Sequence, residues 1–372
     1  MCVKPWLGSQ GFFLLENELK DVRHKVSGLS VTKRLYAGAL LLGVPTFAVS
    51  CLAVSVGPFS VPFSSTFSTM LDLVGFGNST ADPTEQAIIQ SIRLPRIFLA
   101  FIVGAALGIS GGVMQALFRT SMAAPGIIGV SSGGVAGAVF VLALGLNTLS
   151  AFFLPLGAFI GSMIAMTVVF LIANVGGRFS LATLLLGGIA VSSFLSAITT
   201  AVIILTDALT VQRQIIFWIA GGVDTARWEA VQIASPIILF GVIITIFAAR
   251  DLNLLLVSED EARSLGVRVG LVRSVLMISA SLITGAAVAF SGIIAFVGLV
   301  VPHVMRLIVG ADHRVLLPLS ALAGGLFLLV ADTAARIILS PAELRVGIVT
   351  AMFGAPFFVY LLVKNRSRVS ML

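Results

Sequence analysis

The sequence predicts an all-α, polytopic membrane protein with about ten transmembrane helices. Apolar residues (AVILMFWYC) make up 58% of the 372 residues, charged residues make up only 10%, and the mean hydropathy is +1.11. A soluble domain carries about 25% charged residues, so this chain needs lipid around most of its surface. A membrane-spanning helix requires about 20 apolar residues. Stretches that meet this requirement lie at 35–56, 95–117, 126–146, 151–173, 181–205, 229–249, 271–290, 293–309, 315–335 and 345–363.

Ten spans place both chain ends on one side of the membrane, and the basic residues indicate which side. With the N-terminus placed inside, 17 of the 23 Lys and Arg residues fall in cytoplasmic segments. Because short loops rich in Lys and Arg stay in the cytoplasm, we expect both termini to be cytoplasmic. The net charge of +7 is then a topology signal, and no basic patch on a soluble domain indicates a nucleic-acid partner.

The chain is predicted to divide into three regions. Residues 1–34 form a cytoplasmic leader, 35–364 form the transmembrane domain, and 365–372 form a basic cytoplasmic tail. The leader has apolar residues at helical spacing, which favours an amphipathic helix on the membrane surface. A loosely ordered tail explains the same leader equally well.

The loop 250–270 concentrates charge in an otherwise apolar chain. Ser258 followed three residues later by Glu261 fits a capping box at the start of a helix. Acidic residues fill the first turn, where the helix dipole favours them, and Gly266 stands where a glycine ends a helix. The pattern predicts a short, capped helix outside the bilayer, either a docking element for a cytoplasmic partner or a surface helix without one.

Two segments suggest an internal repeat. GAALGISGG (Gly104–Gly112) resembles GAAVAFSGI (Gly285–Ile293), and the two lie on spans that run in opposite directions. Related segments of opposite sense are typical of inverted-topology repeats in transporters. The glycines that recur every fourth residue predict close helix packing, and they are Gly104, Gly108 and Gly112 in one row and Gly129, Gly133 and Gly137 in another.

The signatures of common catalytic chemistry are absent from the sequence. It has no G-x-x-x-x-G-K-[ST] phosphate loop and no H-E-x-x-H or Cys/His cluster. Of the three histidines, His303 and His313 lie near span ends and are interpreted as structural. We therefore expect a chain that is not an enzyme and holds no metal or cofactor of its own.

Five ordered segments resemble the FecCD-type permease family of ABC importers, which take up iron chelates, haem and cobalamin. The resemblance covers about residues 35 to 364. The segments are RLPRIFLAFIVGAALGISGGVMQALFRTSMAAPGIIGVSSG (93–133), LNLLLVSEDEARSLGV (252–267), GIIAFVGLVVPHVMRLIVGADHRVLLPLSALAGG (292–325), ADTAAR (331–336) and ELRVGIVTAMFGAPFFVYLL (343–362).

The resemblance implies an inverted-repeat, ten-span permease of a bacterial cytoplasmic (inner) membrane that works as a dimer, expected here to be a homodimer. It also implies two ATPase subunits on the cytoplasmic side, which hold the ATP and Mg²⁺, and an extracytoplasmic substrate-binding protein. The loop before the seventh span matches the family segment that couples to the ATPase. The matching residues are Glu261, Ala262, Leu265 and Gly266.

The resemblance further implies that arginines at the outer end dock the binding protein, here Arg93, Arg96 and Arg336. Membrane-interface snorkelling explains the first two as well, and an i,i+4 pair with Asp332 explains Arg336. In this family the fifth and tenth spans line the passage. Its candidates on the fifth span are Ser192, Ser196 and Thr199, which hydrogen bonds between helices explain equally well.

The function expected from the sequence is import of a ferric siderophore or a similar iron chelate. Haem and cobalamin are the alternatives, because no residue reads the ligand chemically. An ion-coupled secondary transporter is a remote alternative. Such a transporter usually needs a buried ionisable residue, and Asp332 comes nearest to that position.

Overall fold

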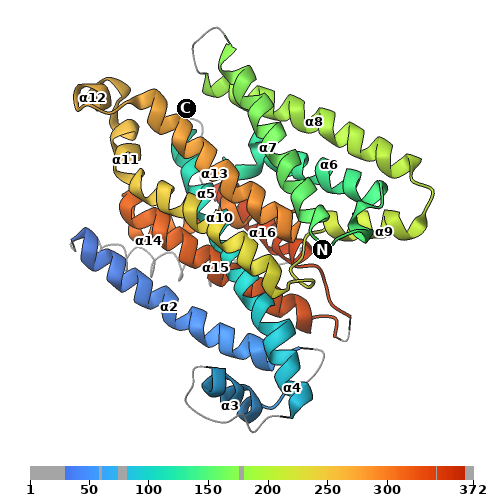
Figure 1. Ribbon diagram of the computed structural model, residues 1–372. Coiled ribbons are helices and arrows are strands. Elements are labelled where there is room, and N and C mark those ends of the chain that lie inside the picture. The colour runs from blue at the N-terminus through green and yellow to red at the C-terminus, as the bar shows by residue number, and fades with distance from the viewer. Residues whose placement is uncertain (1–29, 58–60, 74–81, 176–179, 341, 365–372) are drawn as a thin grey trace, which may run out of the picture.

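The computed structural model describes residues 30–57, 61–73, 82–175, 180–340 and 342–364, and these residues form helices and connections without a strand (Figure 1). Seven helical stretches are long and apolar enough to cross a membrane, and three shorter apolar helices bring the number to the predicted ten. The ten are α2 (Val31–Ser55), α5 (Leu94–Leu117), α6 (Val130–Ala143), α7 (Phe153–Ala173), α8 (Leu181–Leu205), α10 (Trp228–Phe247), α13 (Val269–Ser291), α14 (Val297–Val309), α15 (His313–Ile337) and α16 (Val346–Lys364). The all-helical polytopic fold is thereby confirmed.

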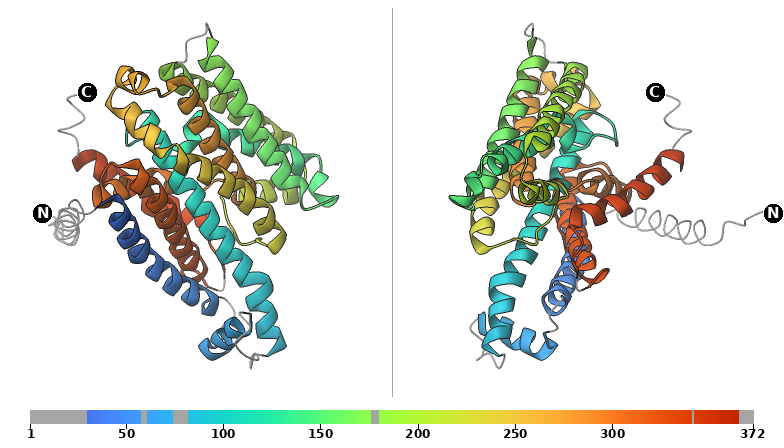
Figure 2. Two further views of the ribbon diagram at one scale, coloured as in Figure 1. Left: turned by 60° about the vertical axis from the view of Figure 1, so that its left-hand side comes forward. Right: turned by 90° about the vertical axis from the view of Figure 1, so that its right-hand side faces the viewer.

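Shorter elements connect the spans, and two pairs of them lie at opposite ends of the helix assembly. Helices α11 and α12 project at one end, and α3 and α4 lie at the other (Figures 1 and 2). We call these the α12 end and the α4 end. The connecting elements are α3 (Phe63–Leu73), α4 (Pro83–Ile88), η1 (Ile89–Arg93), η2 (Pro125–Ile128), η3 (Leu146–Thr148), α9 (Leu209–Ile219), α11 (Ala249–Val257) and α12 (Glu259–Ser264).

The ends of the chain differ from the expectation in one respect. Helix α2 begins at Val31, so the last residues of the predicted leader belong to the first span. The predicted amphipathic segment before it and the basic tail 365–372 lie outside the described residues.

Two of the predicted spans begin later than their apolar sequence suggests. Helix α6 starts after Gly129, which has φ +81°, and α14 starts after Phe296, which has φ +66°. Both N-caps are therefore left-handed, and non-helical backbone precedes each helix. Such backbone is tolerated at membrane depth only where protein surrounds it, and Ile128 and Val297 beside it are 2% and 0% exposed.

Glycines allow the long helices to touch backbone to backbone. A Cβ at Gly104 of α5 would lie 2.3 Å from the Gly324 carbonyl oxygen of α15, and one at Gly133 of α6 would lie 2.3 Å from the Gly161 oxygen of α7. The first predicted glycine row and Gly133 and Gly137 of the second therefore serve close packing, which is the usual role of small residues between membrane helices. Gly129 differs, because it caps α6 in a left-handed conformation.

The predicted repeat has a counterpart in the packing. Helix α5 starts toward the α4 end and α13 starts toward the α12 end, so the two run in opposite directions (Figure 1). Gly104 of α5 packs on α15, and the matching Gly285 of α13 packs on α7, where a Cβ would lie 3.2 Å from Ser162 Cβ. The second span of each half thus packs on the fourth span of the other half, a reciprocal arrangement that fits an inverted repeat.

Candidate functional sites at the two ends of the helix assembly

Helix α12 begins and ends at the residues that the sequence predicted. The Glu261 amide donates to Ser258 Oγ at 3.4 Å. At the other end Gly266 has φ +84°, its amide donates to the Arg263 carbonyl at 3.0 Å, and the Val267 amide donates to the Ala262 carbonyl at 2.9 Å. These two bonds form a Schellman motif, which needs a left-handed residue and therefore favours glycine.

The four predicted coupling residues divide between the two faces of α12. Ala262 is fully buried against the body of the protein, and Leu265 is 67% exposed although it is apolar. Glu261 and Gly266 are also exposed. Ala262 therefore anchors the helix, and only the other three residues are available to a partner.

Two side-chain links, one through Asn253 and one through Arg119, hold α11 (Ala249–Val257), the helix that leads into α12. Asn253 Nδ2 donates to Asp312 Oδ1 at 2.7 Å, and its amide oxygen accepts from the His313 backbone amide at 3.0 Å and from His313 Nδ1, which lies 2.8 Å away. On the other side, Arg119 donates to the Leu255 carbonyl at 3.0 Å. Since Arg119 follows α5 and Asp312 caps α15, these hydrogen bonds tie α11 to both spans.

Asp312 lies outside the membrane spans and is held in its charged form. Arg314 donates to both of its carboxylate oxygens, at 2.7 Å to Oδ2 and 3.1 Å to Oδ1. These bonds, helped by the Arg314 backbone amide and Asn253, lower the pKa of Asp312 to about 2. His313 is 1% exposed and bonded to Asn253, which fits the structural interpretation made from the sequence.

At the α4 end, the three predicted docking arginines are inside the protein. Arg93, Arg96 and Arg336 are 4%, 6% and 3% exposed. Arg96 of α5 donates through Nη2 to Asp332 of α15 at 2.9 Å and through Nη1 to Glu343 at 2.7 Å. The cluster therefore pins α5 to α15 and to the segment that follows α15.

The remaining two arginines of this cluster tie α2 to its neighbours. Arg336 Nη1 donates to the Ala53 and Val56 carbonyls at 3.0 and 3.2 Å, and its Nε lies 3.3 Å from Asp332 Oδ2. Arg93 donates to the Val54 carbonyl. The i,i+4 pair that the sequence allowed for Arg336 is present, and the guanidinium groups also satisfy carbonyls at the C-terminal end of α2.

The predicted pathway residues on α8 do not share one environment. Ser192 is half-buried and faces Gly129, whose added Cβ would lie 3.5 Å from Ser192 Oγ. Thr199 is 6% exposed, whereas Ser196 is exposed. Of these three residues, only Ser196 is exposed on the surface of the single chain.

Several residues of these sites escaped the sequence analysis. Asn253, Glu343 and Arg345 lie in the family-like segments but had no role assigned to them, and Asp224 lies in none of these segments. The structure pairs Asp224 with Arg345. The signal that could have found them is the rarity of charged and amide side chains in a chain with 10% charged residues. Among the described residues, no group of three His, Cys, Asp or Glu side chains could hold a metal ion.

Comparison with known proteins places the chain among permeases. Residues 45–364 match the FecCD transport family. The chain is 46% identical over 279 residues to the cobalamin import system permease protein BtuC of Halobacterium salinarum, an alignment that covers 75% of this chain and 74% of the relative. It is 39% identical to the hemin transport system permease protein HmuU of Yersinia pestis, covering 91% and 98%. An inward-facing structure of a metal-chelate type ABC transporter aligns with TM-score 0.76 and 33% identity, covering 90% of this chain and 99% of that one.

Proposed function

The chain belongs to the FecCD transport family, and from that premise we propose that it is the permease that carries a haem- or cobalamin-type metal macrocycle across the membrane. As a permease of an ABC importer it is a multi-pass membrane protein and not itself an enzyme. The observation that carries the substrate proposal is the similarity to permeases named for hemin and for cobalamin at 39% and 46% identity.

This substrate class differs from the first expectation. A ferric siderophore ranked first on the sequence, with haem and cobalamin as alternatives. The named relatives favour the alternatives, and both of these cargoes are large tetrapyrrole-type rings around a metal ion. Family membership also argues against the alternative of an ion-coupled secondary transporter, because transport would be driven by ATP hydrolysis in a partner subunit.

Coupling to that partner is proposed to pass through α12. The α12 end would then be cytoplasmic, with both termini on the same side. This orientation is supported because it places 17 of the 23 Lys and Arg residues on the cytoplasmic side. Exposed Leu265 and Glu261 would dock on the ATPase, and Ala262 would hold α12 to the protein. A short helix that is capped at both ends can transmit a displacement as a rigid body, because unwinding either end would cost free energy.

The movement would continue into the membrane through α11. Asn253 links α11 to the start of α15, and Arg119 links it to the end of α5. Helices α5 and α15 touch backbone to backbone at Gly104 and Gly324, so they would move as one unit. ATP binding shifts the permease between two states only if the ATPase engages one of them more tightly.

At the α4 end the three arginines would have a structural role. The outer face remains the place where a binding protein would dock, and the permease would work as a homodimer. Arg93, Arg96 and Arg336 would support that face from within, because none is more than 6% exposed. Any direct contact with a binding protein would require the cluster with Asp332 to open.

Transport by a reconstituted complex tests the proposal. The permease, its ATPase and its binding protein would be placed in proteoliposomes, and labelled hemin, cyanocobalamin and a ferric siderophore offered separately. ATP-dependent uptake of hemin or cyanocobalamin is expected. Uptake of the siderophore alone would contradict the substrate class, and uptake of any cargo without the ATPase would contradict the mechanism.

A further inference from the structure

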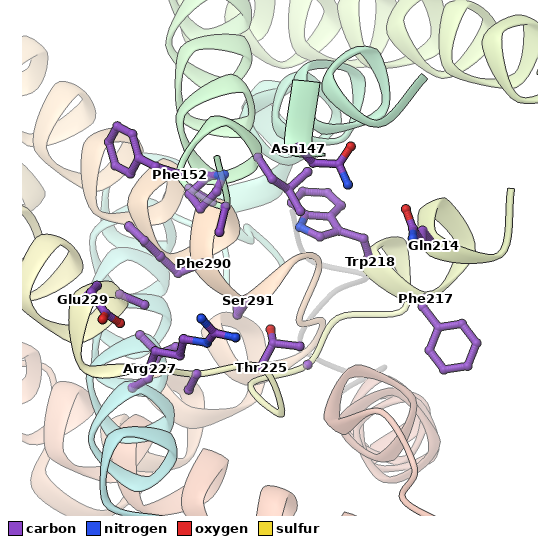
Figure 3. Close-up of a pocket in the computed structure, with 18 of the residues that line it drawn as sticks. Asn147, Phe152, Gln214, Phe217, Trp218, Thr225, Arg227, Glu229, Phe290 and Ser291 are labelled. Carbon is purple, nitrogen blue, oxygen red and sulfur yellow. The ribbon is translucent and has the colours of Figure 1, made fainter. Parts of the chain in front are cut away.

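A cavity of about 910 Å³ opens at the α4 end, within a single copy of the chain. Figure 3 shows side chains from the α6–α7 connection, α9, the start of α10 and the end of α13 arranged around it. Its volume falls in the range of about 300–1,000 Å³ that is typical of small-molecule sites.

One part of the cavity wall is aromatic. Phe152, Trp218 and Phe290 line it from three different elements. Trp218 and Phe290 are half-buried, so the surrounding protein covers part of each side chain and the rest is accessible. Such walls favour a flat, π-rich ligand over a globular polar one.

The lining is also rich in cations. It includes three arginines and one carboxylate, that of Glu229. Arg345 is already occupied, because it pairs with Asp224 and its guanidinium carbon lies 5.0 Å from the centre of the Phe217 ring. Arg213 and Arg227 are exposed, and neither forms an ion pair within the part of the chain that the structure describes.

The backbone beneath these side chains is fixed. The Gly222 amide donates to the Ser291 carbonyl at 2.7 Å, and the Gly347 amide donates to the Gly221 carbonyl at 3.0 Å. These bonds join the turn after α9 to the end of α13 and the start of α16. A cavity whose frame is already ordered loses less conformational entropy when a ligand binds.

We propose that this cavity is a binding site for a planar, dianionic metal chelate, with haem as the cargo that fits it. The two propionates of haem would pair with Arg213 and Arg227, and the porphyrin face would lie against Trp218 and Phe290. Guanidinium groups bind carboxylates through paired hydrogen bonds. Cobalamin carries amides in place of the two free carboxylates and has a single phosphodiester charge, so it would gain less from this pair of arginines. The inference rests on the proposed function and narrows it to one of the two macrocycles.

Direct binding to the purified permease–ATPase complex in phosphatidylcholine nanodiscs tests the site. Hemin binding would be followed by its absorbance in the wild type, in an Arg213→Gln/Arg227→Gln double variant and in an Arg250→Gln control. Arg250 is also an exposed arginine, and it lies at the start of α11 near the α12 end. We expect the double variant to bind hemin at least 10-fold more weakly, and the control to match the wild type. Hemin dimethyl ester, which lacks the carboxylates, should bind the wild type as weakly as hemin binds the double variant.

Three outcomes would overturn the inference. The first is equal hemin affinity in the wild type and the double variant. The second is equal affinity for hemin and its dimethyl ester. The third is a double variant that loses binding of spin-labelled phosphatidylglycerol and keeps hemin, which would make the cavity a lipid-headgroup site.

The same variants separate this inference from the proposed function. ATP-driven hemin uptake that is unchanged in the double variant would overturn the cavity assignment and leave the permease proposal standing. A wild-type complex that imports neither hemin nor cyanocobalamin would overturn the proposed substrate class, whatever the binding experiment gives.

Discussion

Arg96 of α5 and Asp332 of α15 meet at 2.9 Å although 236 residues separate them in the chain. Both side chains are almost completely buried, at 7% and 2% exposure. Arg336 and Glu343 complete the charge balance around them. The pair joins one helix from each half of the inverted repeat, at the end opposite to α12.

Removing one member of this pair should destabilise the protein strongly. Asp332→Asn leaves two buried arginines with too little negative charge, and breaking a buried pair in this way costs about 3–5 kcal/mol. We expect a clear fall in the thermal unfolding midpoint of the purified protein. Asp260→Asn is the control, since its partner Arg263 lies 3.9 Å away at an exposed position. Equal midpoints for the two variants would show that the buried pair contributes nothing.

Gly266 should be required for coupling. Its amide is bonded and its φ is +84°, whereas proline has no N–H and fixes φ near −65°. Gly266→Pro should therefore insert in the membrane and lose most ATP-driven uptake, with Gly266→Ala intermediate because a left-handed alanine costs about 1–2 kcal/mol. Gly270→Ala adds the same methyl group in the first turn of α13, also with nothing within 4 Å, and should transport normally. Normal uptake by Gly266→Pro would reject the coupling assignment.

Asn253 should transmit movement without contacting cargo or nucleotide. Asn253→Ala removes the hydrogen bonds to Asp312 and His313, so ATP hydrolysis by the complex should continue while uptake per ATP falls several-fold. Asn174→Ala is the control, because Asn174 is an exposed asparagine at the end of α7. An unchanged ratio of uptake to hydrolysis in Asn253→Ala would show that α11 is not the link.

The contact between α5 and α15 should not tolerate a methyl group. Gly104→Ala would place Cβ 2.3 Å from the Gly324 carbonyl oxygen, and such overpacking costs about 1–3 kcal/mol. Gly43→Ala in α2 meets nothing within 4 Å and should leave the unfolding midpoint unchanged or raise it. A Gly104→Ala protein as stable as the wild type would mean that the helices are not held at this distance.

Acid should weaken the link between α11 and α15. The pKa of Asp312 falls from 3.8 to about 2 on folding, chiefly because Arg314 donates to its carboxylate. A lowered pKa contributes stability that is present above pH 3.8 and is lost as the pH falls toward 2. Thermal unfolding between pH 5 and about pH 2 should therefore show a smaller pH dependence in Asp312→Asn than in the wild type. If the unfolding midpoints of Asp312→Asn and the wild type depended on pH in the same way, Asp312 would not be the group responsible.

The sequence by itself determined the ten helices, the small-residue rows and the short capped helix α12. Each of these signals is local. A span is a continuous run of apolar residues, and the cap joins residues a few positions apart, such as Ser258 to Glu261 and Ala262 to Val267. The length of the apolar stretch could not show that α6 and α14 begin late. The residues just before Gly129 and Phe296 are mostly apolar, as are those of the helices.

Tertiary structure decided which polar side chains meet. Arg96 is expected at a membrane surface on sequence grounds, and it is buried because the rotation of α5 turns it toward Asp332. The same holds for Asn253 with Asp312, and for the arginines and aromatic rings that five separate segments bring to one cavity. Such contacts depend on which helices are neighbours and how each is rotated about its axis. The pattern of a single helix sets neither, so only the folded chain could reveal them.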